Sequence, residues 1–231
     1  MKYHFDFSFL WDPDNAYWHD LAHGALLSAQ LTLVALATGF CLGTLSAIGR
    51  TSGPHWLRRV IAVYVEIIRN TPLLVQTFWL FFGLASIGIK LPAFVAAVIA
   101  LTINVGAYSA EIIRAGIESI PKGQVEAAEG LALGRVSTFL DVILPPAIEK
   151  VLPALASQFV LMMLASSIMA QISAEELMAA ASRIQSETFR GFEIYIVVAG
   201  IYLVMSIALR ILILGLGWLA FPRRRRLARS R

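Results

Sequence analysis

Long uncharged stretches alternate with polar, charged segments along most of the chain. Gly24 to Gly49 contains no charged residue, and neither do residues 70–89, 91–110 and 151–174, while residues 194–219 contain only Arg210. Because a helix needs about 20 residues to cross the hydrocarbon of a bilayer, each stretch is long enough to span it. The second helix is expected to begin near Val60, before its uncharged stretch, so that Glu66 and Arg69 fall in its first part. We therefore expect membrane spans at about 24–49, 60–88, 91–113, 151–174 and 194–219.

The stretches predict helices, because lipid leaves no partner for an unpaired backbone group and the alternating pattern of a membrane strand is absent. The expected fold class is all-α, a polytopic membrane protein with five transmembrane helices. The predicted organisation is an extracytoplasmic segment 1–23, a transmembrane domain 24–220 that contains a loop 114–150, and a basic tail 221–231.

The composition agrees with a membrane protein. Hydrophobic residues make up 58% of the chain and charged residues 15%, whereas soluble domains are nearer half apolar and a quarter charged. The mean hydropathy is +0.73. Cys41 is the single cysteine, so an intrachain disulfide is impossible. The amino end lacks a basic segment followed by a short apolar one, so we expect no cleaved signal peptide.

The distribution of Lys and Arg predicts the orientation. One side collects Arg50, Arg58 and Arg59, then Arg114, Lys122, Arg135 and Lys150, and finally Arg223 to Arg226, Arg229 and Arg231. The other side holds Lys2, Lys90, Arg183 and Arg190 among the acidic residues Asp6, Asp12, Asp14, Asp20, Glu175, Glu176, Glu187 and Glu193. Loops rich in Lys and Arg remain on the cytoplasmic side of the membrane, so the amino terminus is expected outside and the tail in the cytoplasm. The tail is interpreted as an orientation signal or a contact with anionic membrane lipid, not a nucleic-acid site.

One polar segment lies between two predicted spans. It runs from Pro121 to Pro146 and reads PKGQVEAAEGLALGRVSTFLDVILPP. A segment of this length cannot fold around its own core, so it is expected to dock against something else. Gly123 and Gly134 can separate two short helices within it.

This segment resembles the EAA loop of permease subunits of ATP-binding-cassette importers. That pattern is Glu-Ala-Ala, three residues, Gly, nine residues and Ile-x-Leu-Pro, and Glu126, Ala127 and Ala128 begin it here. Leu144 and Pro145 fall at the matching distance, whereas Ala132 stands where Gly is usual and Val142 where Ile is usual. Two alternatives remain open: the bend between the helices has moved to Gly134, or Ala132 is small enough for close helix approach.

Further stretches resemble the polar amino-acid and opine branch of these permeases, which has the type I fold. They are RNTPLLVQ at 69–76, NVGAYSAEIIRAGI at 104–117, SIPKGQ at 119–124 and ETFRGFEIY at 187–195. The resemblance implies a permease in the bacterial cytoplasmic (inner) membrane. It also implies four kinds of partner: two P-loop ATPase subunits, a second permease that is identical or related, a solute-binding protein and membrane lipid. ATP and Mg would be bound by the partner ATPases and no cofactor by this chain.

The resemblance also assigns residues to two roles. Coupling to the ATPase falls to Glu126, Ala127, Ala128, Leu131, Ala132, Gly134 and Arg135. Glu126 is expected to accept backbone N–H groups or to pair with Arg135, and the two alanines to permit close packing.

A second set of residues is expected to line the translocation pathway. Pro72 should kink or break the second span, and ionisable residues beside such a break are pathway candidates. The candidates are Glu66, Arg69, Asn70, Thr71, Pro72, Gln76, Asn104, Tyr108, Gln158, Ser166 and Gln171. An alternative interpretation makes Glu66 and Arg69 a simple ion pair at i and i+3 on one helix.

Several classes of protein are disfavoured by missing patterns. The sequence has no G-x-x-x-x-G-K-[ST] motif, so the chain is expected not to be an ATPase itself. His4, His19, His23 and His55 are dispersed without the spacing of metal ligands, and no catalytic or metal site is predicted. The sequence shows no strong internal repeat, which counts against a secondary transporter built from two inverted halves of one chain. A channel or secondary carrier not coupled to ATP remains the alternative, and a non-transporting membrane scaffold a third.

Overall fold

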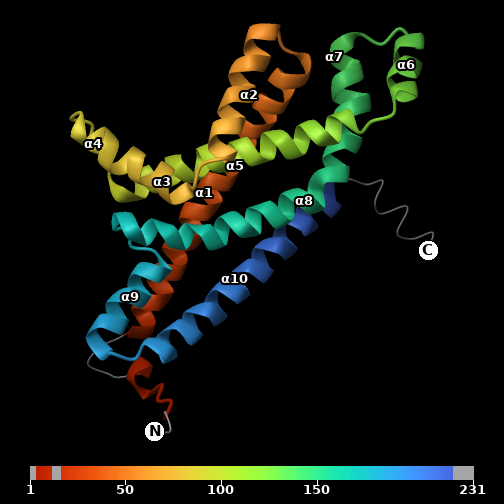
Figure 1. The fold of residues 1–231 in the computed structure, drawn as a ribbon. Helices are drawn as coiled ribbons and strands as arrows, with labels where there is room; N and C mark the ends of the chain where they lie inside the picture. Colours follow the sequence, from red (N-terminus) through yellow and green to blue (C-terminus); the bar gives the residue numbers. More distant parts are fainter. Residues whose placement is uncertain (1–3, 12–16, 221–231) are drawn as a thin grey trace. The chain divides into compact units, whose positions relative to one another are not determined.

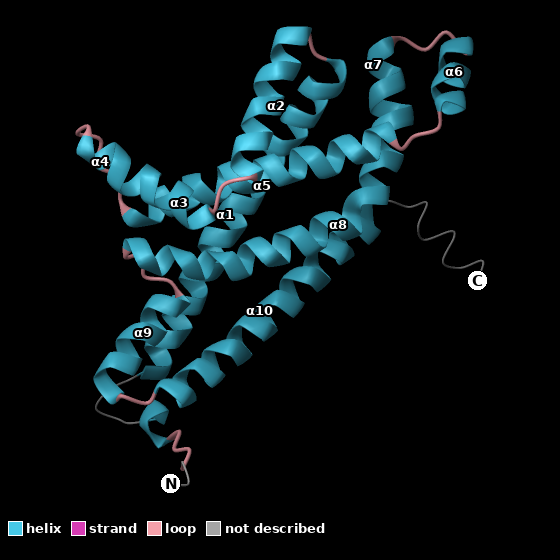
Figure 2. Cartoon of the chain, viewed as in Figure 1, coloured by secondary structure: helices cyan, strands magenta, loops and turns pink. Residues whose placement is uncertain are grey.

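The computed structural model describes residues 4–11 and 17–220, and every regular element in those ranges is helical (Figures 1 and 2). The elements are η1 Ser8–Trp11, α1 Tyr17–Ser52, α2 His55–Arg69, α3 Leu73–Phe78, the π-helical turn η2 Trp79–Gly83, α4 Leu84–Ser86, α5 Ala93–Glu118, α6 Lys122–Gly130, α7 Arg135–Ser137, the π-helical turn η3 Thr138–Ile143, α8 Leu144–Ala165, η4 Ser166–Ile172, α9 Leu177–Thr188 and α10 Gly191–Ala220. The all-α class is confirmed. Lys2, Asp12, Asp14 and the predicted tail 221–231 lie outside the described residues.

Among the described residues, four helical stretches are long and apolar enough to cross a membrane. They are Tyr17–Ser52, Ala93–Glu118, Arg135–Ile172 and Gly191–Leu219. They correspond to four of the predicted spans, although α1 begins seven residues before the expected start at Gly24. The third stretch begins at Arg135, inside the predicted loop 114–150, and not at residue 151. The structure thus supports a polytopic membrane protein.

The predicted second span at 60–88 is not one continuous helix. Helix α2 ends at Arg69, and α3 begins only after Pro72, whose backbone is extended. Proline removes one backbone donor and disfavours helical geometry in the residue before it, which explains the break. Asn70 closes α2, because its backbone N–H and its side-chain amide both donate to the carbonyl oxygen of Glu66, at 3.1 and 2.8 Å.

The chain divides into two compact units, each built from separate parts of the sequence. The first contains residues 1–37, 71–102 and 161–208. In it, α9 lies beside the first part of α1 and of α10 (Figure 1), and Leu21, Leu177, Ile184, Ile194 and Val198 share one apolar cluster. A second cluster joins Leu31, Ala97, Leu101, Met169 and Ile172.

The second unit contains residues 38–70, 103–160 and 209–231 and depends on small residues for its packing. A Cβ atom added to Gly43 would lie 2.5 Å from the Cβ of Ser109, and one added to Gly106 would lie 2.7 Å from the hydroxyl of Tyr64. Glycine at these two positions therefore allows α1 and α2 to approach α5 closely. Val65, Ala107 and Ala110 form the buried contact between α2 and α5.

Candidate functional site

The predicted coupling segment forms a helical hairpin in the second unit (Figure 1). One arm is α6, which begins after Pro121. The other arm begins after Gly134 as α7 and continues through η3 into α8, and α6 packs against η3. The π-helical turn directly precedes Pro145 and Pro146, which lack the N–H groups that would continue the α-helical ladder. This explains why the helix of the second arm forms a wider, π-helical turn there.

Ala132 makes the bend between the arms. Its φ of 58° is left-handed, a conformation that L residues rarely adopt. Its N–H donates to Glu129 O at 2.9 Å, and the N–H of Leu133 donates to Ala128 O at 3.1 Å, which together make a Schellman motif that ends α6. Gly134 has an ordinary φ of −64°. Of the two alternatives, the bend has therefore not moved to Gly134, and the left-handed turn explains why glycine is usual at position 132.

The hairpin carries two kinds of surface. Between its arms, Ala128 is buried, with 3% of its surface exposed. Beside it lies a hollow of about 390 Å³, lined by Gln124, Ala127, Ala128, Leu131, Leu133, Asp141 and Val142. On the outside, Leu131 is 76% exposed and Val136 71%. Large apolar side chains on a polar loop are typical of a surface that binds a partner.

The predicted pairing of Glu126 with Arg135 is not formed. Both residues are exposed, and no ion pair joins them in the part of the chain that the structure describes. Arg135 instead lines a second hollow of about 570 Å³ together with Val136, Phe139, Leu140 and, from α1, Ile48 and Ser52. The residues predicted to couple to an ATPase are thus brought together by small side chains and backbone turns and not by an ion pair between Glu126 and Arg135.

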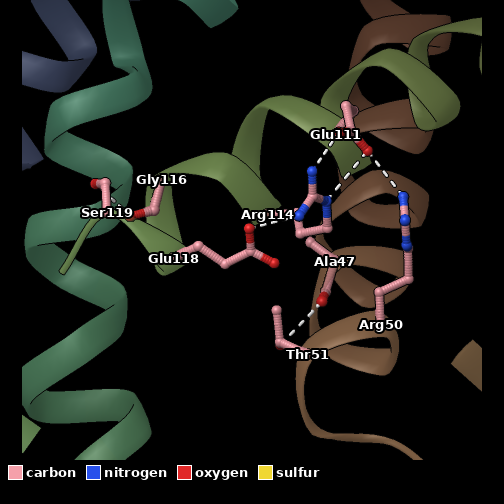
Figure 3. Close-up of polar contacts among 8 residues, drawn as sticks. All are labelled: Ala47, Arg50, Thr51, Glu111, Arg114, Gly116, Glu118 and Ser119. Atoms are coloured by element: carbon pink, nitrogen blue, oxygen red, sulfur yellow. Dashed lines mark hydrogen bonds and ion pairs between the residues drawn. The ribbon is translucent and has the colours of Figure 1, made fainter. Parts of the chain in front are cut away.

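A chain of ion pairs joins the ends of α1 and α5 in the second unit (Figure 3). Arg50 of α1 contacts the carboxylate of Glu111 at 2.8 Å. Along α5, Arg114 pairs with Glu111 on one side and with Glu118 on the other. The side chains of Arg50, Glu111 and Arg114 are about three-quarters buried. Sequence reasoning treated Arg50 and Arg114 as orientation signals. The i, i+3 spacing of Glu111 and Arg114 and the i, i+4 spacing of Arg114 and Glu118 could have indicated the two pairs within α5. No sequence spacing indicates the contact with Arg50.

Arg69 of α2 and Tyr108 of α5 are pathway candidates from different helices that the structure brings into direct contact. The guanidinium carbon of Arg69 lies 5.5 Å from the centroid of the Tyr108 ring, a cation–π contact. The alternative ion pair of Arg69 with Glu66 is not among the ion pairs of the described residues. Next to this contact, Tyr64 donates to the carbonyl oxygen of Ile103 at 2.7 Å. The end of α2 is therefore fixed against α5 by aromatic side chains.

The remaining pathway candidates lie in both units. Asn104 is buried and Gln158 is partly exposed in the second unit. In the first unit, the Gln76 amide donates to the carbonyl and hydroxyl oxygens of Thr71 at 3.0 and 2.8 Å, across Pro72. Ser166 is buried, and its hydroxyl donates to Met163 O at 2.6 Å. Gln76 and Ser166 thus satisfy the backbone carbonyl groups of Thr71 and Met163 near helix breaks or ends.

Gln171 lines a polar hollow of about 560 Å³ in the first unit. Its other lining residues are Asp20, His23, Gly24, Ala170, Ser173, Glu175, Ala179, Ala180, Ser182 and Arg183. Asp20 and Arg183 pair across it at 2.8 Å. Sequence reasoning identified only Gln171 here, since Asp20 and His23 come from α1 and Ser182 and Arg183 from α9, which are distant from it in sequence.

Glu176 is a buried acid that sequence reasoning did not single out. Only 1% of it is exposed, and its carboxylate caps α9 by accepting the N–H of Ala179 at 3.0 Å. The same carboxylate accepts hydroxyl groups from Ser28 of α1 at 3.2 Å and Tyr202 of α10 at 2.7 Å. Burial raises the pKa of the Glu176 carboxyl, and these hydrogen bonds partly offset that rise.

Long apolar helices that carry an exposed helical hairpin between two candidate spans have the form of a membrane subunit of a transport system. The chain belongs to the family described as the binding-protein-dependent transport system inner membrane component, whose model matches residues 39–218. It is a bacterial inner-membrane protein of the ATP-binding-cassette permease class.

Several relatives are similar over nearly the whole chain. The probable glutamine ABC transporter permease protein GlnM of Bacillus subtilis is 41% identical over 204 residues, which cover 88% of this chain and 93% of the relative. The octopine transport system permease protein OccM of Rhizobium meliloti is 35% identical, with 97% and 94% covered. The crystal structure of an amino acid ABC transporter with histidines matches with a TM-score of 0.84 and 38% identity, covering 93% of this chain and 99% of that one.

Replacing Ala132 by glycine should stabilise the hairpin. Alanine in the left-handed region costs about 1–2 kcal/mol, which glycine removes. Glycine in turn loses about 0.4–1 kcal/mol through the greater conformational entropy of the unfolded chain, so we expect a net gain of about 0.8 kcal/mol. Amide hydrogen exchange over residues 123–133 of the purified protein should slow. Gly134→Ala is the control, because its φ is ordinary and nothing lies within 4 Å of an added Cβ. Faster exchange in Gly134→Ala and no effect of Ala132→Gly would place the bend at residue 134.

The raised pKa of Glu176 should make stability depend on pH. The folded chain holds a proton that the unfolded chain releases, so the stability from this group is full below the ordinary glutamic acid pKa and is lost as pH rises through the raised value. The thermal unfolding midpoint in detergent should fall over that window, and Glu176→Gln should remove the fall. Glu175→Gln, at an exposed neighbour, should leave it unchanged.

A companion variant separates titration from hydrogen bonding at the same position. Glu176→Ala removes the acceptor shared by Ser28 and Tyr202 and should cost about 1–3 kcal/mol on both sides of the window. An unfolding midpoint that falls equally with pH in the wild type and in Glu176→Gln would assign the pH dependence to another group.

Proposed function

We propose that this chain is a transmembrane subunit of an ATP-driven, binding-protein-dependent importer of a polar amino acid or an opine-like compound. The whole-length similarity to glutamine and octopine permeases carries the proposal. The chain forms half of the translocation pathway, and a second permease, identical or related, forms the other half. A solute-binding protein delivers the substrate from outside, where we place the amino terminus, and loop 114–150 faces the cytoplasm.

The hairpin of residues 121–146 is the proposed docking element for the ATPase. Two P-loop ATPase subunits bind ATP and Mg, and their closure moves the hairpin. The exposed apolar residues Leu131, Val136 and Leu140 supply contact area. Ala127 and Ala128 keep the hollow between the arms open, so a partner side chain has room to enter. The Schellman turn at Ala132 holds the arms at one fixed angle, which a lever that transmits movement needs.

The pathway is proposed to pass the break between α2 and α3. Arg69 is exposed at the end of α2, lies over the Tyr108 ring and forms none of the ion pairs found among the described residues. Its charge is therefore less neutralised than that of Arg50 or Arg114, each of which pairs with Glu111. A guanidinium in this state suits the carboxylate that every amino-acid substrate carries.

Over-filling the hollow should uncouple ATP hydrolysis from transport. In Ala127→Trp a large ring replaces a methyl group that lines the hollow, so the chain should insert normally but lose ATPase association or its stimulation by the loaded binding protein. The measurement is ATPase activity of the reconstituted complex with and without loaded binding protein. Ala127→Ser, of nearly equal volume, is the matched control and should retain stimulation. Full stimulation in Ala127→Trp would remove the hairpin from coupling.

Loss of the Arg69 charge should reduce uptake without loss of assembly. Arg69→Ala removes the guanidinium, whereas Arg59→Ala, at another exposed arginine of α2, is the matched control and should import nearly normally. Uptake of labelled substrate into vesicles and recovery of the intact complex are measured together. Normal uptake by Arg69→Ala would exclude this residue from the pathway. Uptake driven by a proton or sodium gradient without ATP would contradict the importer assignment itself.

A further inference from the structure

Exposed aromatic side chains surround the first turns of α1 and α10 in the first unit. Trp11, which is 69% exposed, stacks on Trp18 in the first turn of α1, with ring centroids 5.5 Å apart. At the start of α10, Phe189 is 86% exposed and Phe192 68%. Both helices are candidate membrane spans, so these rings lie where a span begins.

The amino-terminal segment, residues 4–11, is fastened to the same place. The guanidinium of Arg190 pairs with the Asp6 carboxylate at 2.7 Å and donates to the Asp6 carbonyl at 2.9 Å. The Asp6 N–H donates to the carboxylate of buried Glu193 at 3.3 Å. Arg190 also lies over the Phe9 ring, 5.5 Å from its centroid. Three kinds of contact therefore hold a short segment against the start of α10.

The segment has an apolar inner side and an aromatic outer side. Leu10 is buried in the cluster that contains Tyr17, Ile194 and Val198. Phe5 and Phe7 are exposed and stacked on each other, with ring centroids 6.3 Å apart. A short η1 turn and the Asp6 carboxylate, which accepts from the N–H and the hydroxyl of Ser8, satisfy local polar groups. A soluble tail would not be expected to keep stacked rings exposed.

We propose that residues 4–11 form an interfacial anchor that lies in the phospholipid headgroup region where α1 and α10 enter the membrane. Trp side chains favour this layer, because the indole ring is apolar while its N–H can donate a hydrogen bond to the headgroups. The exposed Phe rings add apolar area at the boundary with the acyl chains. The occupant of the aromatic surface is thus lipid, at the boundary between headgroups and acyl chains. The exposed rings are continuous with the first turns of α1 and α10, which are candidate membrane spans and would themselves be surrounded by lipid. This position favours lipid over a protein partner. The anchor does not depend on which side of the membrane is outside.

The test measures the depth of Trp11 in the full-length chain. Trp18, Trp56, Trp79 and Trp218 are replaced by Phe, and the protein is reconstituted in phosphatidylcholine vesicles whose acyl chains carry bromine either near the headgroup or near the chain end. Trp11 fluorescence should be quenched most by the shallow bromine and only weakly by aqueous acrylamide. Strong acrylamide quenching with no effect of either brominated lipid would overturn the proposal. Protection of Trp11 only after a solute-binding protein is added would assign the surface to that protein instead.

The contact of Arg190 with Asp6, here called the clamp, allows a matched pair of variants. Arg190→Gln breaks the contact with Asp6 and should lower the docked population of the segment about tenfold, as expected for a charge-assisted hydrogen bond. Shallow-bromine quenching should fall accordingly. Arg183→Gln breaks the comparably exposed pair with Asp20 and should leave quenching unchanged. Equal quenching in both variants, with size-exclusion profiles like the wild type, would show that the clamp does not hold Trp11 at this depth.

Discussion

The backbone's need for hydrogen-bond partners governs this structure, because the surroundings of most of the chain offer none. Helices satisfy that need internally, and so each interruption requires a local substitute. Asn70 closes α2 by donating twice to Glu66 O. Ala132 closes α6 with two backbone bonds. Glu176 opens α9 by accepting the N–H of Ala179. The positions that break helices are therefore also the positions where polar side chains and left-handed residues gather.

These interruptions place the residues on which the proposed function depends. The break at Pro72 leaves Arg69 at a helix end, where it lies over Tyr108. The left-handed turn at Ala132 folds two arms together and leaves Leu131 exposed beside a hollow. Continuous helices would have neither an exposed guanidinium at a helix end nor a hairpin between spans. The residues of the proposed function therefore lie where the regular ladder of backbone hydrogen bonds stops.

The sequence predicted whatever depends on length and local chemistry. Four apolar stretches match candidate spans, and Pro72 marked the break, because both follow from helix geometry alone. The bend in the hairpin stayed undecided, since composition does not reveal that an alanine adopts a positive φ. The contact of Arg50 with Glu111 was missed because it joins residues 61 apart through the close approach of α1 and α5 at Gly43. Glu176 was missed for the same reason, since its hydroxyl partners come from α1 and α10.

The ion-pair chain of Arg50, Glu111, Arg114 and Glu118 has a mechanical consequence. Its charges alternate in sign, so it carries no net charge, and sliding α1 along α5 would separate Arg50 from Glu111 at a place that is largely shielded from water. Only Ser119 and Ile120 lie between the end of α5 and Pro121, where the hairpin begins. Displacement of the hairpin would thus reach α1 through a rigid electrostatic linkage. The contact of 2.8 Å is far shorter than the Debye length of about 8 Å at physiological ionic strength, so salt should hardly loosen it.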